Sequence, residues 1–254
     1  MNWTVITLVS TTDPDDAWDQ LQAAGANPLF ADETPGSPTH IIVEGPVPDL
    51  PFIASTNPYE GATETDWQAQ WETHGHHFHD GHVHIDVGGQ TLKLKPGPGF
   101  GDLSHPTTHL ALELMSPLVP GQVVLDIGCG SGVLTLAAAM AGAKHAYGVD
   151  IEPDALLHSS ENAELNSLED LTTFARSIEI NPDVVVINMI WSEQREAWRE
   201  WAASTQATQA IIASGILATE GDEYAEYMKQ WNWRVDNQME REGWLGFVFV
   251  KSVK

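Results

Sequence analysis

The sequence predicts an α/β fold in which a mostly parallel sheet ends in an antiparallel hairpin and a small α+β domain precedes it. The main reason is the regular alternation of apolar strand patterns with helix patterns in residues 101–254. Such alternation is typical of a parallel sheet covered by helices on both faces. The second reason is a pair of apolar runs near the C-terminus with only a short turn between them. We expect a small domain in residues 1–55, a linker helix with a β-hairpin in 56–100, and the main domain in 101–254.

The first region has the pattern of a strand, a helix and a second strand. Residues 3–9 form an apolar, largely β-branched run that predicts a strand. Asp13 and Pro14 form a helix start signal, and Gly25 follows as a stop signal. Residues 41–43 are a further short apolar run. Together these elements predict a small α+β unit.

The second region predicts a short helix, a hairpin and an exposed loop. Residues 66–72 have helical spacing. Residues 83–87 and 92–94 flank Gly88-Gly89, which is a hairpin signal. The Pro-Gly-Pro-Gly run at 96–99 predicts a rigid loop on the surface.

The main domain contains apolar runs of strand length, each bounded by polar residues or glycine. The last two runs follow one another without a helix, which predicts the closing antiparallel hairpin. The expected strands are 123–125, 146–149, 184–187, 210–213, 233–235 and 246–250, and the expected helices are 133–140 and 153–166.

A glycine-rich loop follows the first strand of the main domain. Asp126 ends that strand, and Gly128, Gly130 and Gly132 follow it at the edge of the sheet where open α/β folds bind ligands. The spacing is G-x-G-x-G and not the G-x-G-x-x-G typical of dinucleotide loops, so S-adenosylmethionine, which has no phosphate, fits better than NAD. Asp150 ends the next strand, 18 residues after Gly132 (150 − 132).

These two carboxylates have distinct expected roles in that ligand site. Asp150 is placed to accept hydrogen bonds from ribose hydroxyls. Asp126 is placed to hold the ligand's amino group, directly or through water. The alternative is that the glycines only close a turn and that Asp150 caps the following helix.

Two further features have a functional and a structural interpretation. Cys129, the single cysteine, has no partner at a recognisable spacing, so we interpret it as a small residue filling the loop and not as a nucleophile. A histidine cluster resembles a zinc site, but no cysteines or helical histidine pair accompany it, so we predict no metal and a polar linker. The cluster is His74, His76, His77, His79, His82 and His84.

The charge balance restricts the partners. The net charge is −25, from 36 acidic and 11 basic residues, which opposes direct nucleic-acid binding and attracts basic proteins. The structural alternative is solubility or adaptation to high salt. Because no apolar run approaches the ~20 residues of a membrane span and no secretory signal is recognisable, we expect a cytoplasmic protein without membrane contact.

Residues 123–166 resemble the ribosomal protein L11 methyltransferase family. Residues 100–108, FGDLSHPTT, are similar to that family's F-G-T-G-x-H-P-T-T motif. Asp66-Trp67 with Trp71, and Glu242-Gly243-Trp244 near the end, also fit its pattern. The resemblance covers roughly residues 64–254, and the N-terminal unit more loosely.

The resemblance implies a seven-stranded, Rossmann-like methyltransferase sheet that uses S-adenosylmethionine, and an N-terminal domain that recognises the protein substrate. It implies methylation of amino groups of ribosomal protein L11, at lysine side chains and an α-amine. By position, Phe100, His105 and Thr107 line the cofactor pocket, and Asn188 lies beside the transferred methyl group. We expect the uncharged carbonyl of Asn188 to orient a neutral amine.

Four departures from the family pattern leave alternatives open, and one of them is the weak similarity of the N-terminal unit, which leaves the substrate open. Residues 102–104 replace T-G-x, bulky residues 189–191 follow Asn188, and the Gly-Asp pair expected to contact adenine is missing. Methylation of another protein's lysine or of a small amine is one alternative. A cofactor-binding protein without catalysis is another.

Overall fold

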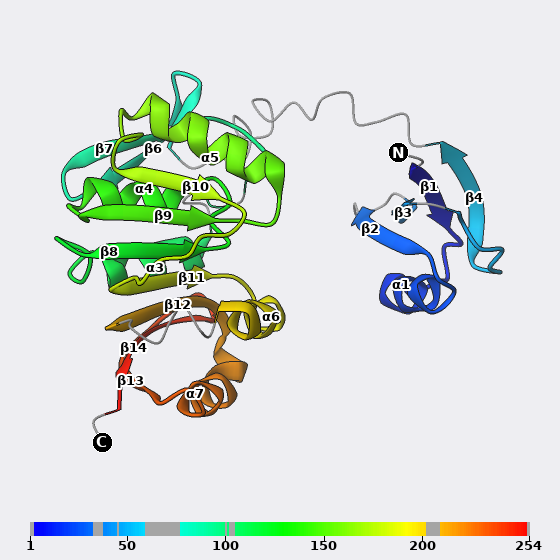
Figure 1. The fold of residues 1–254 in the computed structure, drawn as a ribbon. Coiled ribbons are helices and arrows are strands. Elements are labelled where there is room, and N and C mark those ends of the chain that lie inside the picture. Colours follow the sequence, from blue (N-terminus) through cyan, green and yellow to red (C-terminus); the bar gives the residue numbers. More distant parts are fainter. Residues whose placement is uncertain are drawn as a thin grey trace. The chain divides into compact units, whose positions relative to one another are not determined.

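The chain forms two compact units, Met1–Asp66 and Trp67–Lys254 (Figure 1). The computed structural model describes residues 3–32, 38–44, 46–58, 77–99, 101, 105–201 and 209–252. The boundaries at residues 55 and 100 stay predictions. No helix in these ranges is both long and apolar enough to cross a membrane.

The first unit is a four-stranded antiparallel sheet with one helix. Its strand order is β2-β3-β1-β4, and Ile6, Leu21 and Ile41 are fully buried in its core. The predicted α+β unit is confirmed, although the sequence analysis did not identify β2 and β4. The elements are β1 (Trp3–Leu8), α1 (Pro14–Ala23), β2 (Asn27–Asp32), β3 (His40–Glu44) and β4 (Ile53–Pro58).

The second unit begins with a three-stranded sheet made of β5 (Phe78–His79), β6 (His82–Val87) and β7 (Gln90–Leu94). The predicted hairpin is confirmed: β6 and β7 pair antiparallel around a two-residue turn in which both glycines have positive φ, the type favoured in tight hairpins. The inward-facing residues of β6 and β7 are buried in the same core as the helix that follows the glycine-rich loop, and β7 packs against this helix and the next one.

The main sheet has seven strands in the order β10-β9-β8-β11-β12-β14-β13. The first five are parallel neighbours, whereas β14 pairs antiparallel with both β12 and β13. The predicted mostly parallel sheet with an antiparallel C-terminal hairpin is confirmed. The strands are β8 (Val123–Ile127), β9 (His145–Val149), β10 (Thr172–Ala175), β11 (Val184–Asn188), β12 (Ala210–Leu217), β13 (Trp233–Arg241) and β14 (Trp244–Lys251).

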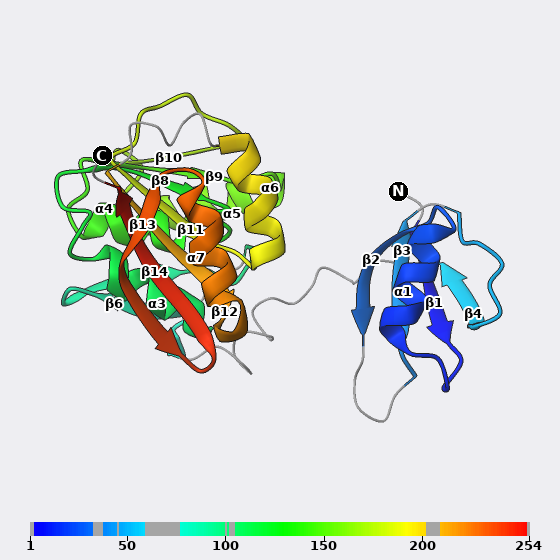
Figure 2. The same ribbon diagram turned by 90° about the horizontal axis from the view of Figure 1, so that it is seen from below.

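Each face of the main sheet has its own core. Val184 and Val186 of β11 face one core and Val185 faces the other, which explains the continuous apolar strand pattern. Figure 2 shows α6 and α7 together on one face, and α3 and α4 on the other. The helices are α3 (Pro106–Met115), α4 (Val133–Met140), α5 (Pro153–Leu165), α6 (Trp191–Trp201) and α7 (Gly221–Lys229), with the short 3-10 helix η2 (Ala218–Glu220) before α7.

Candidate functional site

The carboxyl ends of four neighbouring parallel strands bring the predicted site residues to one edge of the sheet. Asp126 lies near the end of β8, and Asp150 follows β9 directly. Asn188 ends β11 and pairs in register with Ser214 of β12. This edge is where open parallel sheets bind ligands.

The glycine loop is folded onto the end of β9. Gly128 and Cys129 both donate their N–H groups to the carbonyl of Val149, at 2.8 and 3.0 Å. The side chain of Asp150 accepts the N–H of Gly130 at 2.9 Å through Oδ2 and that of Glu152 at 3.0 Å through Oδ1. Asp150 therefore fixes the loop and also supports the residue that precedes α5. It is only half-buried, so its remaining oxygen lone pairs are open to ligand hydroxyls.

Asp126 is a buried carboxyl group with one unpartnered oxygen. Its Oδ2 accepts hydrogen bonds from the N–H and hydroxyl of Thr135, at 3.1 and 2.7 Å. Its Oδ1 is buried without any partner. Burial raises the pKa of Asp126 to about 7, and the charge of Asp150 adds to that rise. A buried, unsatisfied carboxylate oxygen is costly, so this position suits a cationic donor such as the ligand's ammonium group.

Gly128 has a φ of +73° and lies directly under Met189. A Cβ at this position would stand 2.6 Å from the sulfur of Met189, and the positive φ strains the backbone of any residue with a side chain, so glycine is favoured there. The bulky residue that departs from the family pattern after Asn188 thus packs on the cofactor loop. This contact joins the end of β11 to the end of β8.

The segment after Asn188 is held by a side chain that the sequence analysis missed. Gln194 of α6 is fully buried and donates through Nε2 to the carbonyls of Met189 and Ser214, at 2.7 and 2.8 Å. Its Oε1 accepts the hydroxyl of Tyr224. A signal was present in the sequence, because Gln194 stands between Trp191 and Trp198 at helical spacing, on the face that is buried.

His105 and Thr107 cap the start of α3. The N–H and hydroxyl of Thr107 lie 3.4 and 2.8 Å from Nδ1 of His105, and Trp244 contacts His105 edge-on, with ring centroids 5.1 Å apart. Ser214 donates its hydroxyl to the carbonyl of Thr107 at 3.0 Å, which ties this cap to β12. Phe100 and residues 102–104 lie outside the described residues, so their predicted roles stay predictions.

The Pro-Gly-Pro-Gly loop reaches the surface with its prolines, as predicted, but Gly97 and Gly99 are buried. A Cβ on Gly99 would meet the backbone of Gly130 at 2.5 Å, and one on Gly97 would meet the ring of His158 at 2.5 Å. Glycine allows the backbone to pack against the cofactor loop where any side chain would clash. The prediction of an exposed loop was wrong for the two glycines, because composition does not reveal which surface a loop packs against.

His158 of α5 holds this loop and was also missed. Its Nε2 lies 2.8 Å from the carbonyl of Lys95, and its Nδ1 accepts the N–H of Gly99 at 3.2 Å. This pattern requires a neutral ring with the proton on Nε2. Burial lowers the pKa of His158, which favours the same form. No sequence motif marks this role.

Cys129 has the environment of an inert thiol. Its side chain is buried. Burial raises the pKa of the thiol, and the charges of Asp126 and Asp150 raise it further. The thiolate, which is the nucleophilic form, is therefore disfavoured, as the interpretation of Cys129 as a loop-filling residue requires.

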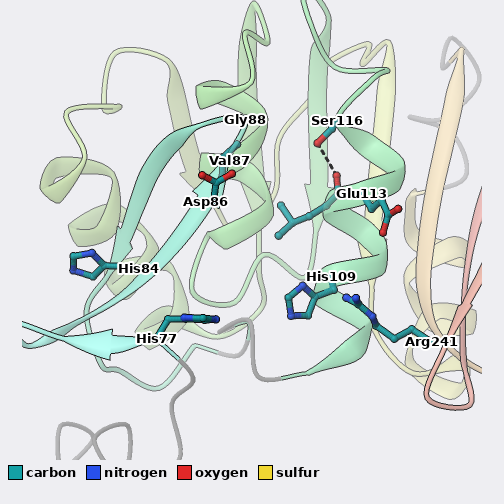
Figure 3. Close-up of a pocket in the computed structure, with 10 residues that line it drawn as sticks. His77, His84, Asp86, Val87, Gly88, His109, Glu113, Ser116 and Arg241 are labelled. Atoms are coloured by element: carbon teal, nitrogen blue, oxygen red, sulfur yellow. Dashed lines mark hydrogen bonds between the residues drawn. The ribbon is translucent and has the colours of Figure 1, made fainter.

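A separate groove of 490 Å³ lies between α3 and the three-stranded sheet (Figure 3). His77 and His84 from the histidine cluster line it together with His109 of α3. His74 and His76 lie outside the described residues, and within those residues no three His, Cys, Asp or Glu side chains are grouped to hold a metal ion. The other lining residues are Asp86, Val87, Gly88, Leu112, Glu113, Ser116 and Arg241, so the cofactor loop takes no part in this groove.

Comparisons with known proteins identify a family and a shared fold. A family model described as ribosomal protein L11 methyltransferase (PrmA) matches residues 54–252. The ribosomal protein L11 methyltransferase of Actinobacillus pleuropneumoniae serotype 3 (strain JL03) is 34% identical over 208 residues, covering 76% of this chain and 70% of the relative. That of Dichelobacter nodosus (strain VCS1703A) is 30% identical over 241 residues, covering 90% and 79%. A crystal structure described as ribosomal protein L11 methylase from Lactobacillus delbrueckii subsp. bulgaricus shares the fold, with a TM-score of 0.59, 24% identity, and coverage of 66% of this chain and 90% of that one.

Proposed function

Because the chain belongs to the ribosomal protein L11 methyltransferase family, and is therefore an S-adenosylmethionine-dependent methyltransferase, we propose that it methylates amino groups of ribosomal protein L11. The targets are lysine side chains, and the α-amine is a further candidate. The observation that carries the proposal is the partnerless, buried Oδ1 of Asp126 beneath the glycine loop, next to Asp150 and Asn188.

The residues at the carboxyl edge fit S-adenosylmethionine, which supplies a methyl group activated by a sulfonium. Asp126 offers an unsatisfied carboxylate oxygen to the ammonium of the amino-acid part. Asp150 offers open lone pairs to the ribose hydroxyls. Gly128 and Gly130 have positive φ and no side chain, so the loop backbone can come close to the ligand. His105, Thr107 and Phe100 complete this proposed pocket.

Asn188 is the proposed catalytic residue because it lies at this edge and carries no charge. A free lysine has a pKa of ~10.4, so its amine must lose a proton before it can accept a methyl group. A carboxylate at this position would hold the amine in its protonated form, whereas an amide carbonyl orients the neutral amine without that effect. Positioning within ~3–3.5 Å of the methyl carbon is the main requirement for such a transfer.

The charge of the protein supports a basic protein as substrate. With 36 acidic and 11 basic residues, its field attracts lysine-rich surfaces and repels nucleic acid. We propose that the first unit contributes to recognition of L11, and that the protein acts in the cytoplasm. Methylation of a different protein's lysine, or of a small amine, is the competing function.

The test is methyl transfer from radiolabelled S-adenosylmethionine into purified L11 and into an extract of cells that lack this methylation. Labelling of L11 alone is the expected result. Labelling of another protein, with L11 unlabelled, would overturn the substrate while leaving the enzyme class intact. Binding of S-adenosylmethionine without any labelling would favour a non-catalytic protein.

A further inference from the structure

Gln194 lies at the junction of the strands that end at the proposed active site. It projects from α6 into the core beneath β11 and β12 and is fully buried. The carbonyls of Met189 and Ser214 accept its two amide hydrogens. Because a carbonyl can only accept, the orientation of the amide is unambiguous: the nitrogen faces the two carbonyls and the oxygen faces the hydroxyl of Tyr224.

These bonds act on the residue that follows Asn188. The backbone of Met189 packs against Gly215, which has a φ of +91° and whose Cβ, if present, would stand 2.2 Å from the Met189 carbonyl oxygen. The side chain of Met189 reaches in the other direction to Gly128 of the cofactor loop. Met189 is thus confined from two sides, and Gln194 fixes its carbonyl between them.

The same network reaches the cap of α3. Ser214, whose carbonyl Gln194 binds, donates its hydroxyl to the carbonyl of Thr107. Ser214 is also the register partner of Asn188. Behind Gln194, Tyr224 accepts a long hydrogen bond of 3.4 Å from Trp198. One buried amide therefore links the segment after Asn188 to β12, and the hydroxyl of Ser214 carries the link on to the α3 cap.

We propose that Gln194 is a positioning residue for methyl transfer, acting by holding the Asn188–Met189 turn against the cofactor loop. The expected fall in kcat rests on the proposed function, whereas the expected change in the position of Met189 does not. A group that must lie in line with a reacting carbon loses about 10²-fold in rate when it is misplaced by about 1 Å. Gln194 contacts neither substrate nor cofactor, so its removal should lower kcat more than it changes KM or cofactor affinity.

The experiment compares Gln194→Leu and Gln194→Glu with Phe249→Leu in the full chain. Leucine removes all three hydrogen bonds at similar volume. Glutamate keeps the length and the acceptor but removes both donors, and protonation restores one of them. Phe249 is fully buried in the same core, and its side chain has no hydrogen-bonding group. Phe249→Leu therefore controls for a loss of stability without a loss of these hydrogen bonds.

Under conditions in which Gln194→Leu is fully folded, its kcat should fall by about 10²-fold. Its affinity for S-adenosylhomocysteine should stay near that of the wild type. The activity of Gln194→Glu relative to wild type should rise as pH falls, because the protonated form donates again. The methyl signal of Met189, observed by ¹³C-methyl labelling of methionine, should shift or broaden in Gln194→Leu but not in Phe249→Leu. An unchanged Met189 signal, or a kcat no lower than that of Phe249→Leu, would overturn this inference. Absence of methyl transfer by the wild type would instead overturn the proposed function.

Discussion

The two halves of the proposed site are built from different kinds of contact. The cofactor half, at the ends of β8 and β9, consists of two carboxylates and backbone N–H groups on a glycine loop. The acceptor half, at the ends of β11 and β12, contains Asn188 and is held by a buried neutral amide. The cofactor half is suited to binding a cation and hydroxyl groups. The acceptor half is suited to placing an amine without adding charge to it.

Replacing Asn188 should have the largest effect of the substitutions considered, and this effect should be confined to the acceptor half. Asn188→Ala should lower kcat by at least about 10²-fold, because the amine loses its orienting carbonyl, while cofactor affinity changes little. Steady-state kinetics with L11 and calorimetry with S-adenosylhomocysteine measure the two effects separately. Asn188→Asp is the matched variant, and its activity should recover partly as pH rises, since the added charge favours the protonated amine. Full activity in Asn188→Ala would remove this residue from the acceptor half.

Replacing Asp126 tests the opposite half. Asp126→Asn keeps the shape but removes the charge that pairs with the ligand's ammonium group, so the cofactor Kd should rise by about 10- to 100-fold, with kcat at saturation much less affected. Calorimetry and saturation kinetics provide the measurements. A large fall in kcat with an unchanged cofactor Kd would contradict the assignment of Asp126 to cofactor binding.

The pH dependence of cofactor binding should follow Asp126. Its pKa lies at about 7, well above the ordinary 3.8, because the group is buried. Only the ionised form pairs with the ammonium group, so affinity should rise with pH up to about 7 and then level off, and it should be about 10-fold weaker at pH 6 than at pH 8. Calorimetry in buffers of different ionisation enthalpy should detect proton release on binding near pH 6. Asp126→Asn should lack this dependence; a persistent slope in that variant would assign the titration to another group.

The same shift predicts how the cofactor-free protein responds to pH. Between about pH 4 and 7 the folded protein keeps the proton of Asp126 while the unfolded chain loses it. The contribution of Asp126 to the free energy of unfolding therefore falls as pH rises through this window. Asp126→Asn should remove that contribution, so chemical denaturation of both proteins at pH 5 and pH 8 should show the largest gain in stability for the variant at pH 8.

The smallest effect is expected one residue away from Gln194. Arg195 is half-buried, forms an ion pair of 2.6 Å with the exposed Glu223 and lies over the ring of Trp191. Arg195→Ala should lower the free energy of unfolding by less than about 1 kcal/mol, because solvent and salt screen exposed pairs. Its kcat should match wild type. A loss comparable to that of Gln194→Leu would show that α6 acts as a whole and not through one amide.

The strand end and the glycine loop of the cofactor half could be located from the sequence because their determinants are local, and the binding roles of these residues stay predictions. Strand end, glycine spacing and the following acid all lie within residues 126–150, and each has a direct geometric meaning. The acceptor half depends on hydrogen bonds between residues distant in sequence, from Gln194 to Ser214 and from Ser214 to Thr107. Asn188 was identified through family resemblance, and spacing alone did not single it out.

The elements that escaped prediction have weak or mixed patterns. β10 has four residues with only one buried side chain, so its apolar signal is faint. Polar residues interrupt the apolar pattern of both α6 and α3: α6 carries Glu and Arg between its buried tryptophans, and α3 begins with Pro-Thr-Thr. Their positions are fixed by contacts with the sheet, which local sequence does not encode.

The placement of β14 sets the order in which this sheet can be completed during synthesis. β14 pairs with both β12 and β13 and buries Phe247 and Phe249, yet it leaves the ribosome after both of them. Until it emerges, β13 has no neighbour in the sheet and Trp244 cannot reach His105. The glycine loop is therefore synthesised long before the strand that completes the sheet and the core behind it.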